Sequence, residues 1–287
     1  MSNHYRNDLR GEAVTLKYAM FGAASLLIAS AGVAVAQDKP GGSGLQAASQ
    51  NPIAALISVP FQSNWFLNTG PNEKTKYVMN FQPVIPVSLS DDWNLILRPI
   101  VPIINKPKLF PGDSSEFGLG DITPQILFSP AKPIDTAIGH MSWGAGPNLL
   151  LDTATDDSLG SGQWGAGPSA VVFFTSAPWT YGALVFNTWS FAGDNDREDV
   201  NLFALQPILN YNLSDGWSLV SAPVITANWE ADSGDKWTVP LGGGVSKLFK
   251  VGGQHVQAQL ASYYNVEKPE FGPDWQLQFQ MKFLFPK

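Results

Sequence analysis

The last strand-like segment of the chain alternates between apolar and polar residues. Asp274–Phe285 reads DWQLQFQMKFLF, with large apolar side chains at every second position from Trp275 and amides or lysine between them. Successive side chains of a β-strand point to opposite faces of the sheet, so one face of this segment is apolar and the other is polar. Only Leu284 departs from this rule. The pattern is typical of a strand that has lipid outside and water inside.

Comparable segments recur along the chain. We count twelve of them, at 53–66, 75–88, 93–104, 118–129, 141–152, 164–175, 179–191, 200–213, 217–229, 236–247, 254–265 and 274–285. Short turns such as 214–216 alternate with long polar loops such as 153–163, although the connection 130–140 is long where a short one is expected. The sequence therefore predicts an all-β fold, a transmembrane up-and-down antiparallel β-barrel of about 12 strands over residues 51–287.

Two further patterns support a barrel, and one argues against it. QPVIPVSLSDDWNLILRPIV, from Gln82, and QPILNYNLSDGWSLVSAPVI, from Gln206, superpose without a gap, as expected of repeated hairpins. All ten tryptophans lie near predicted strand ends, where indole rings form two girdles at the membrane surfaces; the alternative is core packing in a soluble β-protein. Prolines inside the predicted strands disfavour a closed sheet, so we expect bulges there, or strand ends that project beyond the membrane.

The N-terminus reads as an export signal. Arg6, Arg10 and Lys17 precede an apolar stretch over 18–33, and Ala34-Val35-Ala36 matches a cleavage site. We therefore predict a cleaved signal peptide over 1–36, with a membrane anchor helix as the alternative. Residues 37–50 are polar and Gly-rich, which predicts a flexible periplasmic tether before the barrel. The location expected for such a protein is the bacterial outer membrane.

Composition narrows the possible functions. A net charge of −7 argues against a nucleic-acid partner, and the absence of cysteine excludes disulfides. Two histidines beyond the signal cannot make a zinc site without cysteine, and only His255 with Ser262 or Ser246 could suggest a hydrolase. The acidic run 194–199 is read as a solvated loop, with calcium binding as the minor alternative. We predict no catalytic residue, no cofactor and no metal, and hence no enzyme.

Strand parity predicts which side chains face the lumen. The candidates are mostly amides, and they are Gln82, Asn94, Arg98, Asp121, Gln125, Asp152, Gln206, His255, Gln257, Gln259, Gln276, Gln278, Gln280 and Lys282. Twelve strands predict a narrow, partly filled and polar interior, and amides suit neutral or mixed solutes. Arg98 is the strongest candidate to contact a solute, and the alternative is that it pairs with Asp121 or Asp152.

Several of these segments resemble a known family. FQPVIPVSLSDDWNLILRPIVPI, WGAGPNLLLDTATDD, LGSGQWGAGPSAVV, WTYGALVFNTWSFAGD and the closing FLFPK are similar to outer-membrane proteins named after the meta-pathway of phenol degradation, often labelled transporters or neuromedin-U-like. The resemblance implies a barrel in contact with outer-membrane lipid and lipopolysaccharide, and uptake of small molecules, aromatic or hydrophobic ones among them. The final strand also resembles the signal read by the barrel-assembly machinery, although Pro286 and Lys287 follow its last aromatic residue.

The function expected from these features is passive passage of small solutes. The alternatives are a non-conducting structural or adhesive surface barrel that acts through its extracellular loops, a barrel enzyme, and a soluble periplasmic β-protein.

Overall fold

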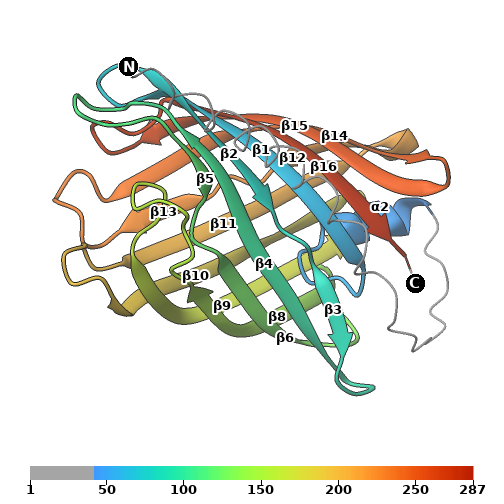
Figure 1. The fold of residues 1–287 in the computed structure, drawn as a ribbon. Helices are drawn as coiled ribbons and strands as arrows, with labels where there is room; N and C mark the ends of the chain where they lie inside the picture. Colours follow the sequence, from blue (N-terminus) through green and yellow to red (C-terminus); the bar gives the residue numbers. More distant parts are fainter. Residues whose placement is uncertain (1–41, 287) are drawn as a thin grey trace, which may run out of the picture. The chain divides into compact units, whose positions relative to one another are not determined.

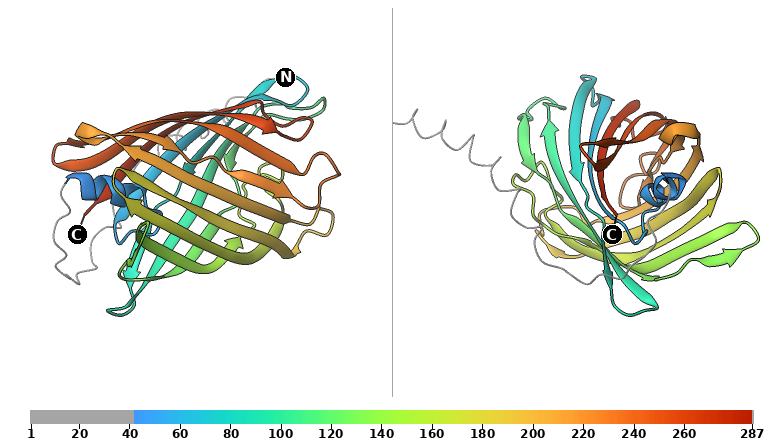
Figure 2. Two further views of the ribbon diagram at one scale, coloured as in Figure 1. Left: turned by 180° about the vertical axis from the view of Figure 1, so that it is seen from behind. Right: turned by 90° about the vertical axis from the view of Figure 1, so that its right-hand side faces the viewer.

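The chain forms a closed antiparallel barrel of twelve strands. A computed structural model describes residues 42–286, and Figures 1 and 2 show the barrel from three sides. Its elements are α2 (Gly42–Gln50), β1 (Ile57–Thr69), β2 (Lys74–Phe81), β3 (Ile85–Ser88), β4 (Trp93–Lys106), β5 (Glu116–Leu119), β6 (Thr123–Pro130), β7 (Ile134–Thr136), β8 (Gly139–Leu150), β9 (Gln163–Ser176), β10 (Trp179–Gly193), β11 (Asn201–Asn212), the 3₁₀ turn η2 (Ser214–Gly216), β12 (Trp217–Ser221), β13 (Ile225–Asn228), β14 (Trp237–Val251), β15 (Gln254–Glu267) and β16 (Trp275–Phe285).

The sheet closes between the first and last strands. β1 pairs antiparallel with β16 from Ile57 opposite Phe285 to Leu67 opposite Trp275. Because each strand also pairs with its neighbour in sequence, the topology is up-and-down, as the alternation of short turns and long loops predicts. The predicted fold class is confirmed, and each of the twelve predicted segments overlaps one strand of the barrel.

Three of the twelve strands are interrupted, and the interruptions accommodate several prolines. β2 and β3, β5 and β6, and β12 and β13 are pairs of short strands that each share one position in the barrel. Pro83 lies between β2 and β3, Pro223 lies between β12 and β13, and Pro240 lies at a register shift against β15. The missing N–H of these residues therefore falls where the ladder is already broken.

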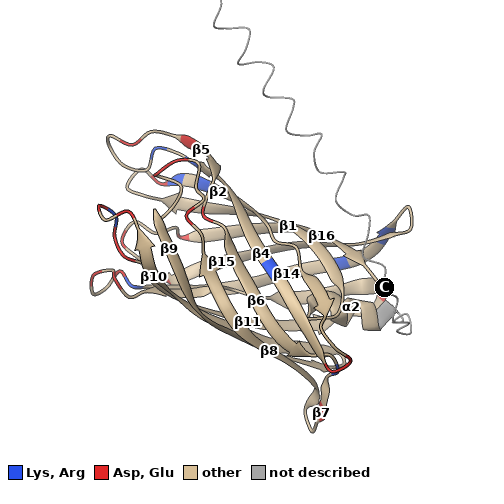
Figure 3. Ribbon diagram, turned by 60° about the horizontal axis from the view of Figure 1, so that its bottom comes forward, with Lys and Arg blue, Asp and Glu red and all other residues tan. Residues whose placement is uncertain are grey.

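The long connection 130–140 is itself partly a hairpin. β7 pairs with the start of β8 from Ile134 opposite Met141 to Thr136 opposite Gly139, so this connection is a two-stranded extension of the wall. It projects beyond the neighbouring strands in Figure 3. The short turns consequently all lie at one end of the barrel, the turn end, and the long loops lie at the other, the loop end. By the rule for outer-membrane barrels, the turn end faces the periplasm.

The outer surface carries an apolar band between two aromatic belts. Eight of the ten tryptophans are exposed, namely Trp93, Trp164, Trp179, Trp189, Trp217, Trp229, Trp237 and Trp275. Neighbouring rings touch within each belt: Trp93 meets Trp143 at the turn end, and Trp229 meets Trp237 at the loop end. Charged residues gather in the loops and turns and leave the strands almost free of charge (Figure 3). This surface matches a lipid bilayer, and the protein is an outer-membrane barrel.

The segment predicted to be a flexible tether differs in the structure. Residues 42–50 form helix α2, which lies inside the turn end of the barrel (Figure 2). Leu45 of this helix packs against Leu56 and Leu284, so the one residue that breaks the alternation of the last strand is a contact of the helix. Residues 37–41 and the predicted signal peptide lie outside the described residues. Within residues 42–286, no helix is long and apolar enough to span a bilayer.

A second apolar cluster fixes the chain between α2 and β1. Ile53 is buried against Ile96, Leu127, Val171 and Leu184, which point into the barrel from four different strands. We call residues 42–56 the N-terminal plug. The barrel proper therefore begins at Ile57, rather than at residue 51.

Leu284→Ala is expected to loosen the plug without opening the barrel. Truncating a buried leucine costs about 2–5 kcal/mol, and here the lost contacts belong to α2. Hydrogen exchange at residues 44–50 should accelerate, while exchange in β15 and β16 should stay slow. Leu277→Ala, on the lipid-facing side of the same strand, is the matched control and should leave α2 protected. Equal acceleration in both variants would contradict the contact.

Candidate functional site

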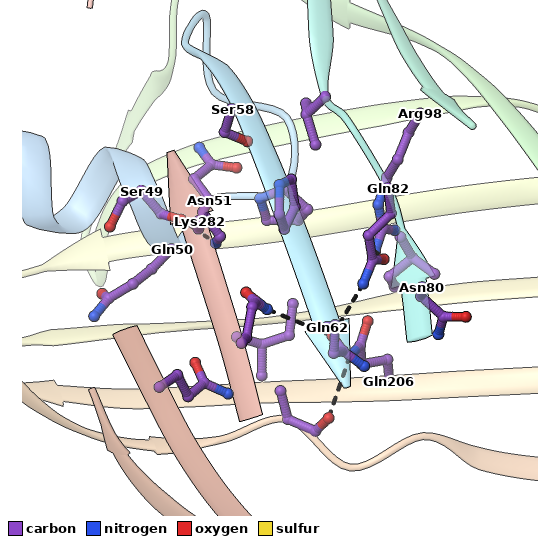
Figure 4. Close-up of a pocket in the computed structure, with 18 of the residues that line it drawn as sticks. Ser49, Gln50, Asn51, Ser58, Gln62, Asn80, Gln82, Arg98, Gln206 and Lys282 are labelled. Atoms are coloured by element: carbon purple, nitrogen blue, oxygen red, sulfur yellow. Dashed lines mark hydrogen bonds between the residues drawn. The ribbon is translucent and has the colours of Figure 1, made fainter. Parts of the chain in front are cut away.

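A polar cavity occupies the middle of the barrel. This central cavity has a volume of about 240 Å³ and is lined by side chains from the strands and from the plug (Figure 4). Nine of the fourteen residues that parity directs to the lumen lie on its lining: Gln82, Arg98, Gln125, Gln206, Gln257, Gln259, Gln278, Gln280 and Lys282. These residues come from β4, β6, β11, β15, β16 and the break between β2 and β3.

The amides of the cavity wall are bonded to one another. Gln62 Oε1 accepts a hydrogen bond from Gln82 Nε2 at 3.0 Å and one from Gln280 Nε2 at 3.4 Å. Asn64 Oδ1 accepts from Gln276 Nε2 at 2.9 Å and from Gln278 Nε2 at 3.3 Å. Amides suit this position because each one both donates and accepts, so neighbouring amides can bond to one another without net charge.

Arg98 is part of this network and has amide partners. Its Nη1 donates to Gln125 Oε1 at 2.9 Å, and its Nη2 donates to Gln82 Oε1 at 3.4 Å. Among residues 42–286, Arg98 forms no salt bridge. The structure therefore does not show the expected alternative, an ion pair with Asp121 or Asp152.

The two aspartates have other surroundings. Asp121 accepts four hydrogen bonds from the loop after β8: from the backbone N–H groups of Thr153, Ala154 and Ser161, and from Ser161 Oγ. Its contacts are therefore with a loop at the loop end rather than with the central cavity. Asp152 is exposed.

The remaining candidates also lie off the central cavity. Asn94 is half-buried in β4 between Ser88 and Ser129, and Gln276 bonds to Asn64. His255 is half-buried near the turn end, opposite Lys250 and Leu284. Within the described residues it hydrogen-bonds to neither of the serines considered for a hydrolase, and Ser246 Oγ instead accepts a bond from Gln257 Nε2 at 3.4 Å.

The plug forms the floor of the central cavity, and sequence reasoning missed it. Ser49, Gln50, Asn51 and Pro52 line the cavity from the turn end. Lys282 Nζ donates to the carbonyl of Ser49 at 2.7 Å, which satisfies one carbonyl in the last turn of α2. One signal was available, because Ile96, Leu127, Val171 and Leu184 have the parity of lumen residues and need an apolar partner inside the barrel.

A second cavity opens at the loop end. This vestibule has a volume of about 720 Å³, and it shares Ile100, Gln125 and Phe186 with the lining of the central cavity. Asp196, Arg197, Glu198 and Asp199 also line it, so the acidic run of the sequence stands at its wall. Among the described residues, no group of three or more acidic or histidine side chains is placed to hold a metal ion. The two cavities are neighbours along the lumen, and the three side chains that line both lie where they meet.

The rim of the loop end carries a carboxylate that we expect to act as an acid-sensitive clasp. Asp274 accepts a hydrogen bond from Asn68 Nδ2 at 2.9 Å and pairs with Lys268 Nζ at 3.1 Å, which joins the end of β1 to the loop before β16. The Asn68 amide first, and then Lys268, lower the pKa of Asp274 below its ordinary value. A lowered carboxyl pKa stabilises the fold above the unfolded pKa of about 3.9, and this stabilisation is lost as the pH falls through the lower folded value.

The clasp should consequently stay closed at neutral pH and open only below about pH 4. Proteolysis of loop 266–274 by an acid-active protease should rise by a few-fold in that range for the wild type, since an exposed ion pair contributes little. Asp274→Asn should cleave readily at all pH values tested. A wild-type profile that matches the variant's would contradict the clasp.

Comparison with known proteins agrees with the fold. No family model and no curated protein matches the chain. Among solved structures, an outer membrane channel from Pseudomonas putida F1 superposes with a TM-score of 0.58 at 17% identity, over 80% of this chain and 94% of that chain. A FadL homologue of Pseudomonas aeruginosa covers 83% of this chain and 92% of its own at 9% identity, but its TM-score of 0.34 is too low to carry an argument.

At 17% identity, the first likeness shows the fold alone. It supports the architecture of an outer-membrane barrel. The resemblance to the phenol meta-pathway family remains a prediction from the sequence motifs.

Proposed function

We propose that this protein is a passive outer-membrane channel for small solutes, aromatic or hydrophobic compounds among them, and that it is not an enzyme. The observation that supports it most is the arrangement of two cavities in one closed barrel, which meet at Ile100, Gln125 and Phe186. In this proposal a solute enters at the loop end and reaches the central cavity past these shared side chains. Partners in this proposal are outer-membrane lipid, lipopolysaccharide, the solute, and the assembly machinery during insertion.

The lining favours solutes of mixed polarity. Amides from β15 and β16 face apolar side chains such as Leu184, Phe186 and Ile208 across the central cavity. A solute with a polar end and an apolar body can therefore exchange its hydration for amide contacts on one side and apolar packing on the other. Aromatic compounds with one polar substituent have this character.

The plug sets the condition for passage. α2 and residues 51–52 close the floor of the central cavity, so a solute can leave toward the periplasm only when the plug shifts. Polar contacts hold much of the plug, because Gln46 and Gln50 bond to Trp217 O, Ser218 Oγ and Asn212 Oδ1. Water can replace such contacts at modest net cost, about 0.5–1.5 kcal/mol each.

The same floor favours a second candidate function, a closed surface barrel that acts through its extracellular loops. Liposome swelling with uncharged solutes of increasing size separates the two. A channel gives swelling that declines with solute size. If no solute enters through either the wild type or a variant without the plug, the closed barrel is the better description.

A further inference from the structure

The central cavity contains a cation without a counter-ion. Arg98 reaches into the cavity from β4, and its two hydrogen-bond partners among the described residues are the neutral amide oxygens of Gln125 and Gln82. No described carboxylate lines this cavity. Charges removed from bulk water are usually paired, because a lone charge costs several kcal/mol to bury. The site is therefore electrostatically prepared for an anion.

Donors beside the cavity are only partly used. Gln125 is 1% exposed, and its Nε2 has no hydrogen-bond acceptor among the described residues. Its orientation is fixed, because Oε1 of the same amide faces Arg98 Nη1. Arg98 itself has five N–H donors, of which two are used in these bonds. A ligand with acceptor atoms could use the remaining N–H groups of Arg98.

Comparison of the two repeated hairpins shows that only the first one carries an arginine at this position. When the hairpins from Gln82 and Gln206 are superposed, Arg98 falls on Ala222. In the second hairpin Gln206 Nε2 donates to the carbonyl of Ala222 at 3.2 Å, whereas in the first Gln82 accepts from Arg98. The hairpin can thus form without an arginine, and both glutamines line the same cavity.

The rest of the lining limits the ligand. Ile100, Leu184, Phe186, Ile208 and Val224 give the cavity an apolar portion. Its volume of about 240 Å³ lies below the roughly 300–1,000 Å³ of pockets for drug-sized molecules. A small molecule with one anionic group and a compact apolar body fits both features.

From these features we infer that the central cavity binds a small organic carboxylate, with the carboxylate on Arg98 and the apolar body toward Leu184 and Phe186. A carboxylate matches better than a spherical anion, because the guanidinium offers parallel donors to two oxygens. The inference rests on the proposed function only for the route of entry, since binding itself does not require passage.

Two other groups of charges act on this site. Lys282 lines the same cavity and adds positive charge, although its Nζ is partly satisfied by Ser49 O. The vestibule carries Asp196, Glu198 and Asp199 beside Arg197. Those carboxylates lower the local concentration of anions and slow their entry at low salt, but they leave the bonds at Arg98 unchanged. Binding is therefore best measured at equilibrium and near physiological ionic strength.

Equilibrium dialysis of radiolabelled benzoate against the full mature chain in lipid nanodiscs tests the inference. Benzamide, which lacks the charge, is the matched ligand. Arg98→Gln keeps hydrogen bonding and removes the charge, and Arg98→Ala installs the residue of the related hairpin. Lys247→Gln removes one positive charge from the outer belt, where Lys247 stacks on Trp217. Circular dichroism checks that each variant is folded. Nanodiscs that hold the Arg98 variants also show how much benzoate dissolves in the lipid alone.

Saturable binding of benzoate to the wild type, with affinity lower by about 30-fold in both Arg98 variants and unchanged in Lys247→Gln, is the expected result. Equal binding by the wild type and the Arg98 variants would overturn the inference, as would equal binding of benzamide. If chloride displaces benzoate as effectively as acetate does, the carboxylate assignment is wrong. If benzoate binds as expected but no solute permeates liposomes, the proposed channel function is wrong, whereas the inferred binding site stands.

Discussion

Replacing Leu45–Gln50 with a Gly-Ser sequence of the same length is expected to raise the single-channel conductance of the protein several-fold. The replacement removes the Leu45 contact with Leu56 and Leu284 and five side-chain hydrogen bonds between the helix and the wall. Without them, the one remaining bond, from Lys282 Nζ to the carbonyl of residue 49, does not offset the cost of ordering the segment, about 1–2 kcal/mol per residue for the backbone. The floor of the central cavity should then open toward the periplasm.

The measurement is current through single proteins in a planar bilayer, with liposome swelling as a second readout. Gly44→Ala is the control, because residue 44 is exposed and alanine favours a helix over glycine by about 1 kcal/mol. Its conductance should equal that of the wild type. If the Gly-Ser replacement also leaves conductance unchanged, the plug does not limit passage through the lumen.

The second large effect is expected at Asp121. Removing its carboxylate in Asp121→Ala strips an acceptor from three backbone N–H groups and one hydroxyl in the loop 153–161. Hydrogen bonds to a charged group contribute about 1.5–3 kcal/mol each, so local opening should become easier by about 2 kcal/mol or more. The rate of proteolysis within this loop should rise by about 30-fold, since cleavage tracks the open population.

Two further variants serve as controls for the effect of Asp121→Ala on proteolysis. Asp152→Ala removes an exposed carboxylate from the same region and should leave cleavage unchanged. Asp121→Asn should fall between the two, because one oxygen can still accept while the amide nitrogen faces N–H donors. Barrel melting temperature should stay the same in all three variants. Equal cleavage of Asp121→Ala and the wild type would show that the loop is held by other contacts.

The strands could be predicted from the sequence because the physical rule is local. A strand between lipid and water tends to alternate, and the last segment does so with Leu284 as its one exception. The other segments were recognised as strand-like runs between turn residues. Boundaries differ where pairing continues past the alternation: β14 runs on to Val251, because Gly252 and Gly253, with φ of 54° and 87°, make the tight turn before β15.

The plug could not be predicted in the same way, because its helix depends on distant contacts. GSGLQAASQ contains two glycines and two serines, and nine residues are too few for a stable helix in water. The barrel interior supplies the partners that make it helical. Leu284 was visible as the one break in the last strand, but its meaning needed a partner in space.

In the candidate site, too, the facing of side chains could be predicted from the sequence, but their partners could not. Parity directs Arg98, Gln125 and the glutamines of β15 and β16 to the lumen, and the structure brings them to one cavity. Parity alone does not show how far along the lumen a residue lies. Asp121 has the parity of the lumen set, yet it serves the loop after β8. The partner of Arg98 likewise depends on how far along the lumen each side chain lies. The pairing register of the strands determines that position, and composition does not.

The central claim is a closed barrel whose last strand turns aromatics to lipid and amides to the lumen. Because the chain has no cysteine, single spin labels can be placed at Leu277, Gln278 and Phe279 of the protein in bilayers. The account predicts that labels at 277 and 279 collide readily with lipid-soluble oxygen, and that the label at 278 does not. Lipid contact at 278 with protection at 277 and 279 would contradict it.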